Sequence, residues 1–492
     1  MIFYAMFLPC EKFTKMKKYI YLVVLSILIS WTLTHAQNVG VGTTTPAEKL
    51  HVAGNIKGDT VKPEVLKILT NASVGKVLTS DAVGNALWQT NNAATGGNIG
   101  FGVWGDCATN GNITEYNPVA DATGVANNAF GYTVSISGNY AIVGSFGDNS
   151  SQGSANIYQY NGSNWVFIQK LTDATGAAND YFGISVFISG NYAMVGSYRD
   201  DVGVNLDQGS VSIFQFDGTS SWVFKQKLTD ATGAAADYFG VSVSLSGNYL
   251  IVGANGDDGG AGIDQGSVIF YQYSGGSWVF MQKITDVTGA ANDYFGSSVS
   301  LSGTYAIVGA LFDDVGAITN QGSASIYQFN GATWVFRQKI TDATGDYFDN
   351  FGTSVSISGN YAVVGINGDE VGSNSGQGSA SIYQFNGSNW VLMQKITEIS
   401  GAASDNFGIS VAISDNYVIV GANQSVTNRG SATIFLKVGN GWQKLQHITD
   451  PGGNSNDNFA FATAIDGITK QFFIGAYGYV NNTGKVVFGK IN

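Results

Sequence analysis

Residues 351–365 read FGTSVSISGNYAVVG, and this stretch decides the fold. Apolar and polar side chains alternate from Val355 to Ser358, Gly359-Asn360 follows, and Tyr361 begins a second apolar run that ends in Val-Gly. Alternation with a period of two is typical of a strand with one buried face, and Gly-Asn favours a tight turn. The stretch therefore predicts a β-hairpin.

Two more strands are predicted directly downstream. After a longer connection rich in Asp and Gly, residues 380–385 alternate again, and Asn386-Gly387 is a strong two-residue hairpin signal. A fourth apolar run extends from Trp390 to Ile396. The whole segment is therefore expected to be a four-stranded antiparallel meander.

The same pattern recurs along the chain. Phe-Gly pairs begin at Phe130, Phe182, Phe239, Phe295, Phe351 and Phe407, with a degenerate Phe459-Ala460, at intervals of 52 to 57 residues. Four short strands in a repeat of this length, present seven times, predict a seven-bladed β-propeller rather than a solenoid.

The two ends of the array predict how the ring closes. The seventh copy ends with a third strand at residues 485–490, and no Trp strand follows it. Residues 113–120 align with the Trp strand of the next copy, with Val119 opposite Leu171. We therefore expect an all-β fold, a seven-bladed propeller over residues 101–492 closed by its own N-terminal strand, which removes both exposed edges.

These motifs resemble the FG-GAP repeat of integrin-α-type β-propellers, in its secreted bacterial form. The resemblance implies a ligand-binding or adhesive role at the cell surface. The Asp-x-Asp-x-Asp-Gly calcium loop of integrin-like repeats is missing, because only Ser-Gly-Asn or a similar turn joins the first two strands. The calcium site of that family therefore does not carry over to this chain.

The N-terminal 100 residues have a different character. Lys17 and Lys18 precede an apolar run over residues 20–33, so residues 1–36 are interpreted as a signal peptide and residues 1–15 as an untranslated upstream start. We expect a secreted or cell-surface protein that begins at Gln37 and has no transmembrane span in its mature chain. A retained single-span anchor is the alternative.

Residues 37–100 are similar to the head region of tail-fibre-like surface proteins of Bacteroidetes, as in VGVGTTTPAEKLHV from Val39. This resemblance implies a small β-rich stalk and a linker. A homotrimer through this segment is the oligomer that such a stalk favours.

Composition excludes several classes of function. The 492 residues carry a net charge of −12, so a nucleic-acid partner is not expected. Cys10 and Cys107 cannot form a disulfide framework, and a buried or a reactive Cys107 both remain open. Only three His are present, which leaves no catalytic residue to assign. A non-enzymatic binding protein is expected, and a carbohydrate-active enzyme that uses loop carboxylates or a purely structural surface component is the alternative.

In a ring of meanders, the connections between second and third strands and those between blades lie on one face, where most acidic residues gather. This face is expected to bind an extracellular glycan or a protein. The candidate ligand-binding residues are Asp200, Asp201, Asp207, Asp257, Asp258, Asp264, Asp313, Asp314, Tyr181, Tyr238 and Tyr294. No cofactor is expected. Weak calcium binding by these acids is one alternative, and solvated Asp-rich turns are the other.

Overall fold

The computed structural model describes residues 117–121, 126–259, 262–450 and 453–491, together with four short strands nearer the N-terminus. The chain divides into two compact units, Met1–Thr109 and Asn110–Asn492. The expected signal peptide, Cys10, Cys107 and residues 113–116 lie outside the described residues. Within the described ranges, no helix has the length and apolar character needed to cross a membrane.

The first unit contains two small sheets. β1 (Val39–Val41) pairs in parallel with β2 (Leu50–Val52), and β3 (Lys76–Ser80) pairs antiparallel with β4 (Ala86–Thr90). That this unit forms a stalk stays a prediction.

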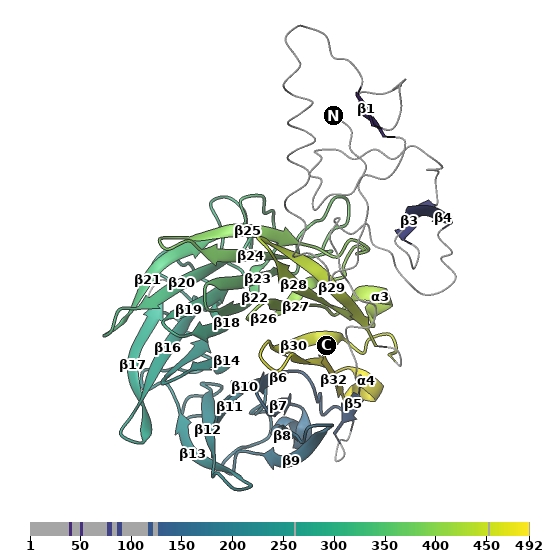
Figure 1. Cartoon of the computed structure of the whole chain (residues 1–492). Helices are drawn as coiled ribbons and strands as arrows, with labels where there is room; N and C mark the ends of the chain where they lie inside the picture. Colours follow the sequence, from purple (N-terminus) through teal and green to yellow (C-terminus); the bar gives the residue numbers. More distant parts are fainter. Residues whose placement is uncertain are drawn as a thin grey trace. The chain divides into compact units, whose positions relative to one another are not determined.

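The second unit is a seven-bladed β-propeller of four-stranded antiparallel blades, as the repeat pattern predicts (Figure 1). The first three blades consist of β6 (Val134–Ser137), β7 (Tyr140–Ser145), β8 (Ser154–Tyr160) and β9 (Trp165–Leu171); β10 (Ser185–Ser189), β11 (Tyr192–Ser197), β12 (Ser210–Phe216) and β13 (Trp222–Leu228); and β14 (Phe239–Ser246), β15 (Tyr249–Ala254), β16 (Ser267–Ser274) and β17 (Ser277–Thr285).

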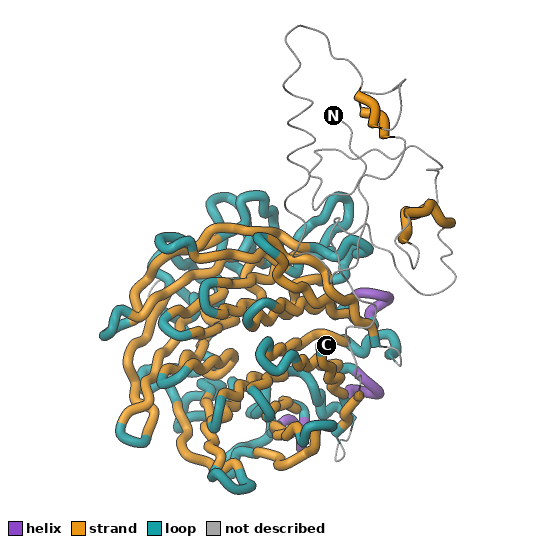
Figure 2. Tube along the Cα trace, viewed as in Figure 1, coloured by secondary structure: helices purple, strands orange, loops and turns teal. Residues whose placement is uncertain are grey.

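Blades four to six repeat the arrangement. They consist of β18 (Phe295–Ser302), β19 (Tyr305–Ala310), β20 (Ser323–Phe329) and β21 (Trp334–Ile340); β22 (Phe351–Ser358), β23 (Tyr361–Ile366), β24 (Ser379–Phe385) and β25 (Trp390–Ile396); and β26 (Phe407–Ser414), β27 (Tyr417–Ala422), β28 (Ser431–Val438) and β29 (Gly441–Thr449). The first strands of neighbouring blades contact one another, so they surround the centre of the ring, and the fourth strands lie outermost (Figure 2).

The seventh blade closes the ring as expected. It contains β30 (Phe459–Asp466), β31 (Gln471–Ala476), β32 (Lys485–Lys490) and, as its fourth strand, β5 (Asn117–Ala120). β5 runs antiparallel to β32, with Val119 opposite Val486 and Ala120 opposite Lys485. The propeller therefore has no unpaired first or last blade.

Glycine allows neighbouring blades to approach closely. Gly196 stands in the Val-Gly pair of blade two, and a Cβ atom there would lie 2.1 Å from the carbonyl oxygen of Gly240 in blade three. Gly240, from the Phe-Gly pair, itself has a φ of +95°, which L side chains rarely adopt. The two repeat glycines that define the sequence pattern are thus contact points between blades.

The core lies between adjacent blades rather than inside one sheet. One cluster joins Ile142 of blade one with Phe182, Val195 and Trp222 of blade two. The Trp side chains that open the fourth strands are buried, and Trp222 packs edge-on against Tyr140 of the preceding blade with ring centroids 5.4 Å apart. Packing between blades is therefore the role of these tryptophans.

Candidate functional site

We use "loop face" for the side of the ring that carries the connections between second and third strands and those between blades. The second-to-third connections of blades two to five each have twelve residues, at 198–209, 255–266, 311–322 and 367–378. In blades one, six and seven the connection has eight residues and contains a short helical turn: α2 (Asp148–Ser151), α3 (Ser425–Asn428) or α4 (Tyr479–Asn482). Two classes of loop thus divide the loop face.

Buried ion clusters occupy the loop face between blades. In blade two, the Nζ atom of Lys227 lies 2.8 Å from Asp173 Oδ2 and also pairs with Asp200. Equivalent clusters join Lys283 to Asp230 and Asp257, Lys339 to Asp286 and Asp313, and Lys395 to Asp342 and Asp369. Each lysine lies on a fourth strand and links an acid from the blade-to-blade connection with an acid from its own blade. These four lysines therefore neutralise part of the acidity predicted for this face.

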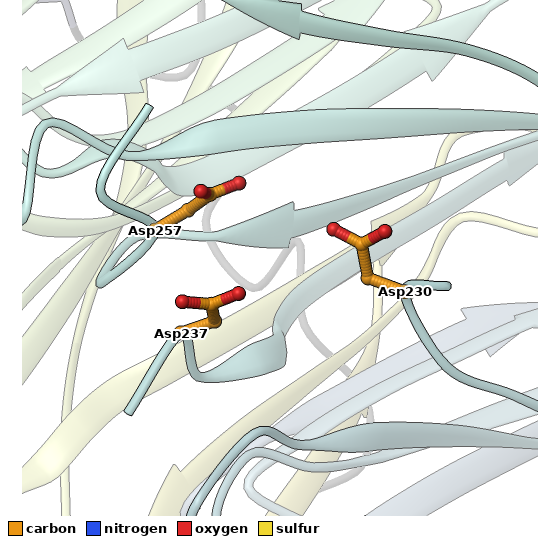
Figure 3. A group of neighbouring side chains, drawn as sticks. All are labelled: Asp230, Asp237 and Asp257. Atoms are coloured by element: carbon orange, nitrogen blue, oxygen red, sulfur yellow. The ribbon is translucent and has the colours of Figure 1, made fainter. Parts of the chain in front are cut away.

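A third acid lies beside each of these pairs. Burial raises the pKa of Asp237, Asp293 and Asp349 to about 6, and the charge of a neighbouring carboxylate adds to the effect. Figure 3 shows Asp237 with Asp230 and Asp257, whose ligand atoms lie within 4.8 Å of one another. Because the ammonium group of Lys283 contacts two of these carboxylates, the protein supplies its own cation here.

The candidate aspartates fall into two sets. Asp200, Asp257 and Asp313 are buried in the ion clusters. Asp201, Asp258 and Asp314 are exposed, and each accepts the backbone N–H of the residue six positions later in its loop. That residue is Asp207 at 2.9 Å in blade two, Asp264 at 3.1 Å in blade three, and Asn320 at 2.8 Å in blade four. In blade two, Asp201 thus accepts a hydrogen bond from the backbone of Asp207, whereas Asp200 forms an ion pair with Lys227.

The candidate tyrosines lie at the inner edge of the loop face, and two of them belong to a continuous row of aromatic rings. We call this row the aromatic arc; neighbouring ring centroids are 4.6 to 5.5 Å apart. Its members, from blade seven to blade three, are Phe461, Tyr477, Tyr132, Phe146, Tyr181, Tyr198 and Tyr238. The guanidinium of Arg199 lies 5.4 Å from the Tyr181 ring and 5.3 Å from the Tyr198 ring. Tyr294 of blade four packs edge-on against Phe312, with ring centroids 5.5 Å apart.

Other blades have asparagine at one or both of the positions that hold Tyr181 and Tyr198 in blade two. Asn350, Asn406 and Asn458 replace the tyrosine before Phe, and Asn255, Asn367 and Asn423 follow the second strand. Asn423 donates to Asn458 Oδ1 at 3.2 Å, across the junction between blades six and seven. At the inner edge of the loop face, blades five and six therefore carry amides at both positions, whereas blades three and seven carry both an aromatic ring and an amide.

Sequence reasoning missed a change in the ion cluster of blade six. Glu398 takes the place of the first Asp, and His447 takes the place of the cluster lysine. Glu398 pairs with Lys444 at 2.6 Å and with His447 Nδ1 at 3.2 Å. Burial acts to raise the pKa of Glu398, but the hydrogen bonds from His447 and Lys444 outweigh it and hold that pKa below its usual range. The substitutions at 398 and 447 were visible in the sequence, whereas their contact was not.

Comparison with known families agrees with this architecture. The FG-GAP repeat matches six segments, residues 119–158, 165–214, 222–271, 278–327, 334–383 and 390–435, and each runs from a fourth strand to the third strand of the next blade. No curated protein sequence matches the chain. FG-GAP repeats are typical of extracellular proteins, and their propeller fold indicates a surface or binding role in general. Because the six segments cover more than half of its length, the chain belongs to the FG-GAP repeat family.

Proposed function

We propose that the protein is a secreted or cell-surface binding protein, adhesive in character, that binds a glycan or a protein on its loop face. The observation that carries this proposal is the aromatic arc. Blades five and six adopt the same fold with asparagine at the positions that hold Tyr181 and Tyr198 in blade two. The fold therefore does not require tyrosine there, and a ligand supplies the reason for it.

A glycan suits this arc best. Half-buried Tyr181, Tyr198 and Tyr238 offer aromatic faces to the C–H groups of sugar rings, and their hydroxyl groups can bond to sugar hydroxyls. The exposed carboxylates of Asp201 and Asp258 stand on the neighbouring loops as further acceptors. Since the buried aspartates are paired with lysines, the acids left for a ligand are these outer ones.

A combined glycan and matrix-protein array tests the proposal. We expect the wild type to bind one class of ligand on the arrays. A Tyr181→Ala, Tyr198→Ala variant is expected to bind that ligand with an apparent affinity at least tenfold lower. Phe167→Ala is the matched control, because Phe167 is a half-exposed aromatic residue on the outermost strand β9. Absence of binding on both arrays, or equal binding by the arc variant, would contradict the proposal.

Export and assembly belong to the same proposal. Mass spectrometry of secreted material is expected to find Gln37 at the N-terminus, and size-exclusion chromatography with light scattering is expected to find a trimer that removal of residues 37–100 converts to a monomer. The alternative of a carbohydrate-active enzyme would show turnover in a glycoside screen. The purely structural alternative would show neither turnover nor array binding.

A further inference from the structure

A pocket of about 360 Å³ opens on the loop face at blade six. The connection between β25 and β26 contributes Glu398 and Asp405, the turn α3 contributes Ser425 and Asn428, and β29 contributes His447. This pocket is separate from the aromatic arc, whose residues belong to blades seven and one to three.

The pocket exists because blade six omits groups that blades two to five contain. Blade five places Asp369 four residues after its Val-Gly glycine and Lys395 five residues after its Trp, and these two side chains form an ion pair at 2.7 Å. At the same two positions blade six has Ser425 and His447, and its loop is four residues shorter. Ser425 and His447 thus line the pocket where blade five has an ion pair, and Lys444, from another position of β29, supplies the ammonium group that pairs with Glu398.

Glu398 cannot be the acceptor that a ligand would use. Its Oε1 atom accepts from Lys444 at 2.6 Å and from the Ser400 hydroxyl at 3.1 Å, and its Oε2 atom accepts from the Thr433 hydroxyl at 2.8 Å. His447 Nδ1 lies 3.2 Å from the same Oε2 atom. Both carboxylate oxygens therefore already have partners.

Three other acceptors face the pocket. Asp405 is 6% exposed and uses Oδ2 to accept the N–H of Ala402 at 2.7 Å, and within the described residues it has no lysine beside it, unlike Asp349 of blade five. When His447 donates through Nδ1 to Glu398, its Nε2 atom is an acceptor. Ser425 is 5% exposed, and its side chain lines the same pocket.

We propose that this pocket binds the primary ammonium group of a lysine side chain from a polypeptide partner. An ammonium group has three N–H donors, which match the Asp405 carboxylate, His447 Nε2 and the Ser425 hydroxyl. The chain's own lysines show the same recognition in blades two to five, where an ammonium group bridges buried acids. The partner's ammonium group thus takes the position that Lys395 holds in blade five, where blade six has His447, while Lys444 remains paired with Glu398.

The test titrates the full-length protein with the capped tripeptide acetyl-Gly-Lys-Gly-amide and follows the imidazole NMR signals of His447. We expect saturable shifts with the lysine peptide and at least tenfold weaker binding of the Nζ-acetylated peptide and of the arginine peptide. Equal binding of the acetylated peptide, or no shift at millimolar lysine peptide, would overturn the proposal.

Two variants locate the site. Asp405→Asn keeps the Ala402 hydrogen bond but removes the charge, and His447→Lys places an internal ammonium group in the pocket, as in blade five. Both variants are expected to bind the lysine peptide at least tenfold more weakly than the wild type and to unfold at a temperature near that of the wild type. Because His447→Lys lacks the imidazole that reports binding by NMR, calorimetry measures its affinity. Unchanged affinity in both folded variants would overturn the proposal. The Tyr181→Ala, Tyr198→Ala variant should bind the lysine peptide with the affinity of the wild type. The peptide titration therefore tests the pocket at blade six, and the arrays test the aromatic arc, independently of one another.

Discussion

The Oδ2 atom of Asp466 accepts a hydrogen bond of 2.7 Å from the backbone N–H of Gly138, although 328 residues separate the two. At five other blade interfaces a serine hydroxyl accepts the equivalent N–H, as Ser414 does from Gly467 at 3.0 Å. The junction between the last and first blades thus has a carboxyl acceptor where these five have a hydroxyl. Hydrogen bonds to charged groups are the stronger kind.

Replacing Asp466 by Ala is expected to lower the free energy of unfolding by about 2 kcal/mol, because hydrogen bonds to charged groups contribute about that much. The change also removes the acceptor for the backbone N–H groups of Ile468 and Thr469. Urea unfolding followed by tryptophan fluorescence measures the loss. Asp466→Asn keeps one acceptor oxygen and should lose less stability than the Ala variant. An Ala variant as stable as the wild type would contradict the assigned role.

Gly196→Ala is expected to prevent folding or to destabilise the propeller severely, because the new Cβ atom would lie 2.1 Å from a backbone oxygen of the next blade. Gly190→Ala is the matched control in the same blade. It has a φ of +58° but nothing within 4 Å of the added Cβ, so only about 1 kcal/mol of backbone strain is expected. Thermal unfolding compares the two variants, and equal losses would show that close contact between blades is not the constraint.

Millimolar calcium is expected to leave the melting temperature of the wild type unchanged, because the ammonium group of Lys283 already pairs with Asp230 and Asp257, beside Asp237. A Lys283→Ala variant should lose about 3 kcal/mol, since breaking a buried pair leaves uncompensated carboxylates. Calcium should then restore part of its melting temperature through mass action. Lys225→Ala removes an exposed lysine from β13 of the neighbouring blade and should show neither effect. A calcium response in the wild type would instead favour binding by the outer acids.

The raised pKa values of Asp237, Asp293 and Asp349 predict a pH effect of definite sign. Each carboxyl binds its proton more tightly in the folded protein, with a pKa of about 6 against the ordinary 3.8. The proton therefore adds to the free energy of unfolding in full below about pH 4, and this contribution is lost as the pH rises through 6. Asp237→Asn should therefore gain melting temperature relative to the wild type at pH 8 and much less at pH 5. Asp201→Asn, at an exposed position, serves as the control. The same difference at both pH values would contradict the prediction.

The opposite sign holds for Asp230 and Asp342. Burial alone would raise the pKa of these carboxyls, but the hydrogen bonds from Lys283 and Lys395 outweigh it and lower that pKa. Their ionised carboxylates add to the free energy of unfolding above about pH 4, and this contribution is lost as the pH falls below that value. Because the two sets of acids titrate in opposite senses, the whole propeller is expected to show a stability maximum in mildly acidic solution.

The sequence predicted the ring and its closure because both follow from local periodicity. Alternation placed the strands, and alignment with Leu171 placed Val119 opposite the last strand, where the structure has it. The first strand of blade five was expected to begin at Val355 and instead begins at Phe351. A register shift between these residues interrupts the alternation, so the pattern hid the extension.

The ion clusters could not be predicted in the same way. Lys227 and Asp173 lie 54 positions apart in different blades, so their pairing depends on how the blades pack. The aromatic arc also depends on contacts between blades, because Phe146 and Tyr181 come into contact only when blades one and two pack side by side in the propeller. The pocket at blade six did leave a sequence signal, because His447 occupies the position of a repeated lysine. That departure carries meaning only when the ion cluster around it is known.

Pairing between β5 and β32 makes the earliest strand of the propeller the last to find its partner. The ribosome delivers a chain from its N-terminus, so residues 117–120 emerge before any complete blade, and their partner strand, residues 485–490, emerges last. Every intermediate blade can fold on its neighbour in the meantime, but the circle is complete only when the final strand arrives. A chain cut short anywhere before β32 keeps an open edge on both sides of the gap, which exposes it to proteases and to aggregation. Only a chain that contains both β5 and β32 can therefore close the propeller and cover both edges.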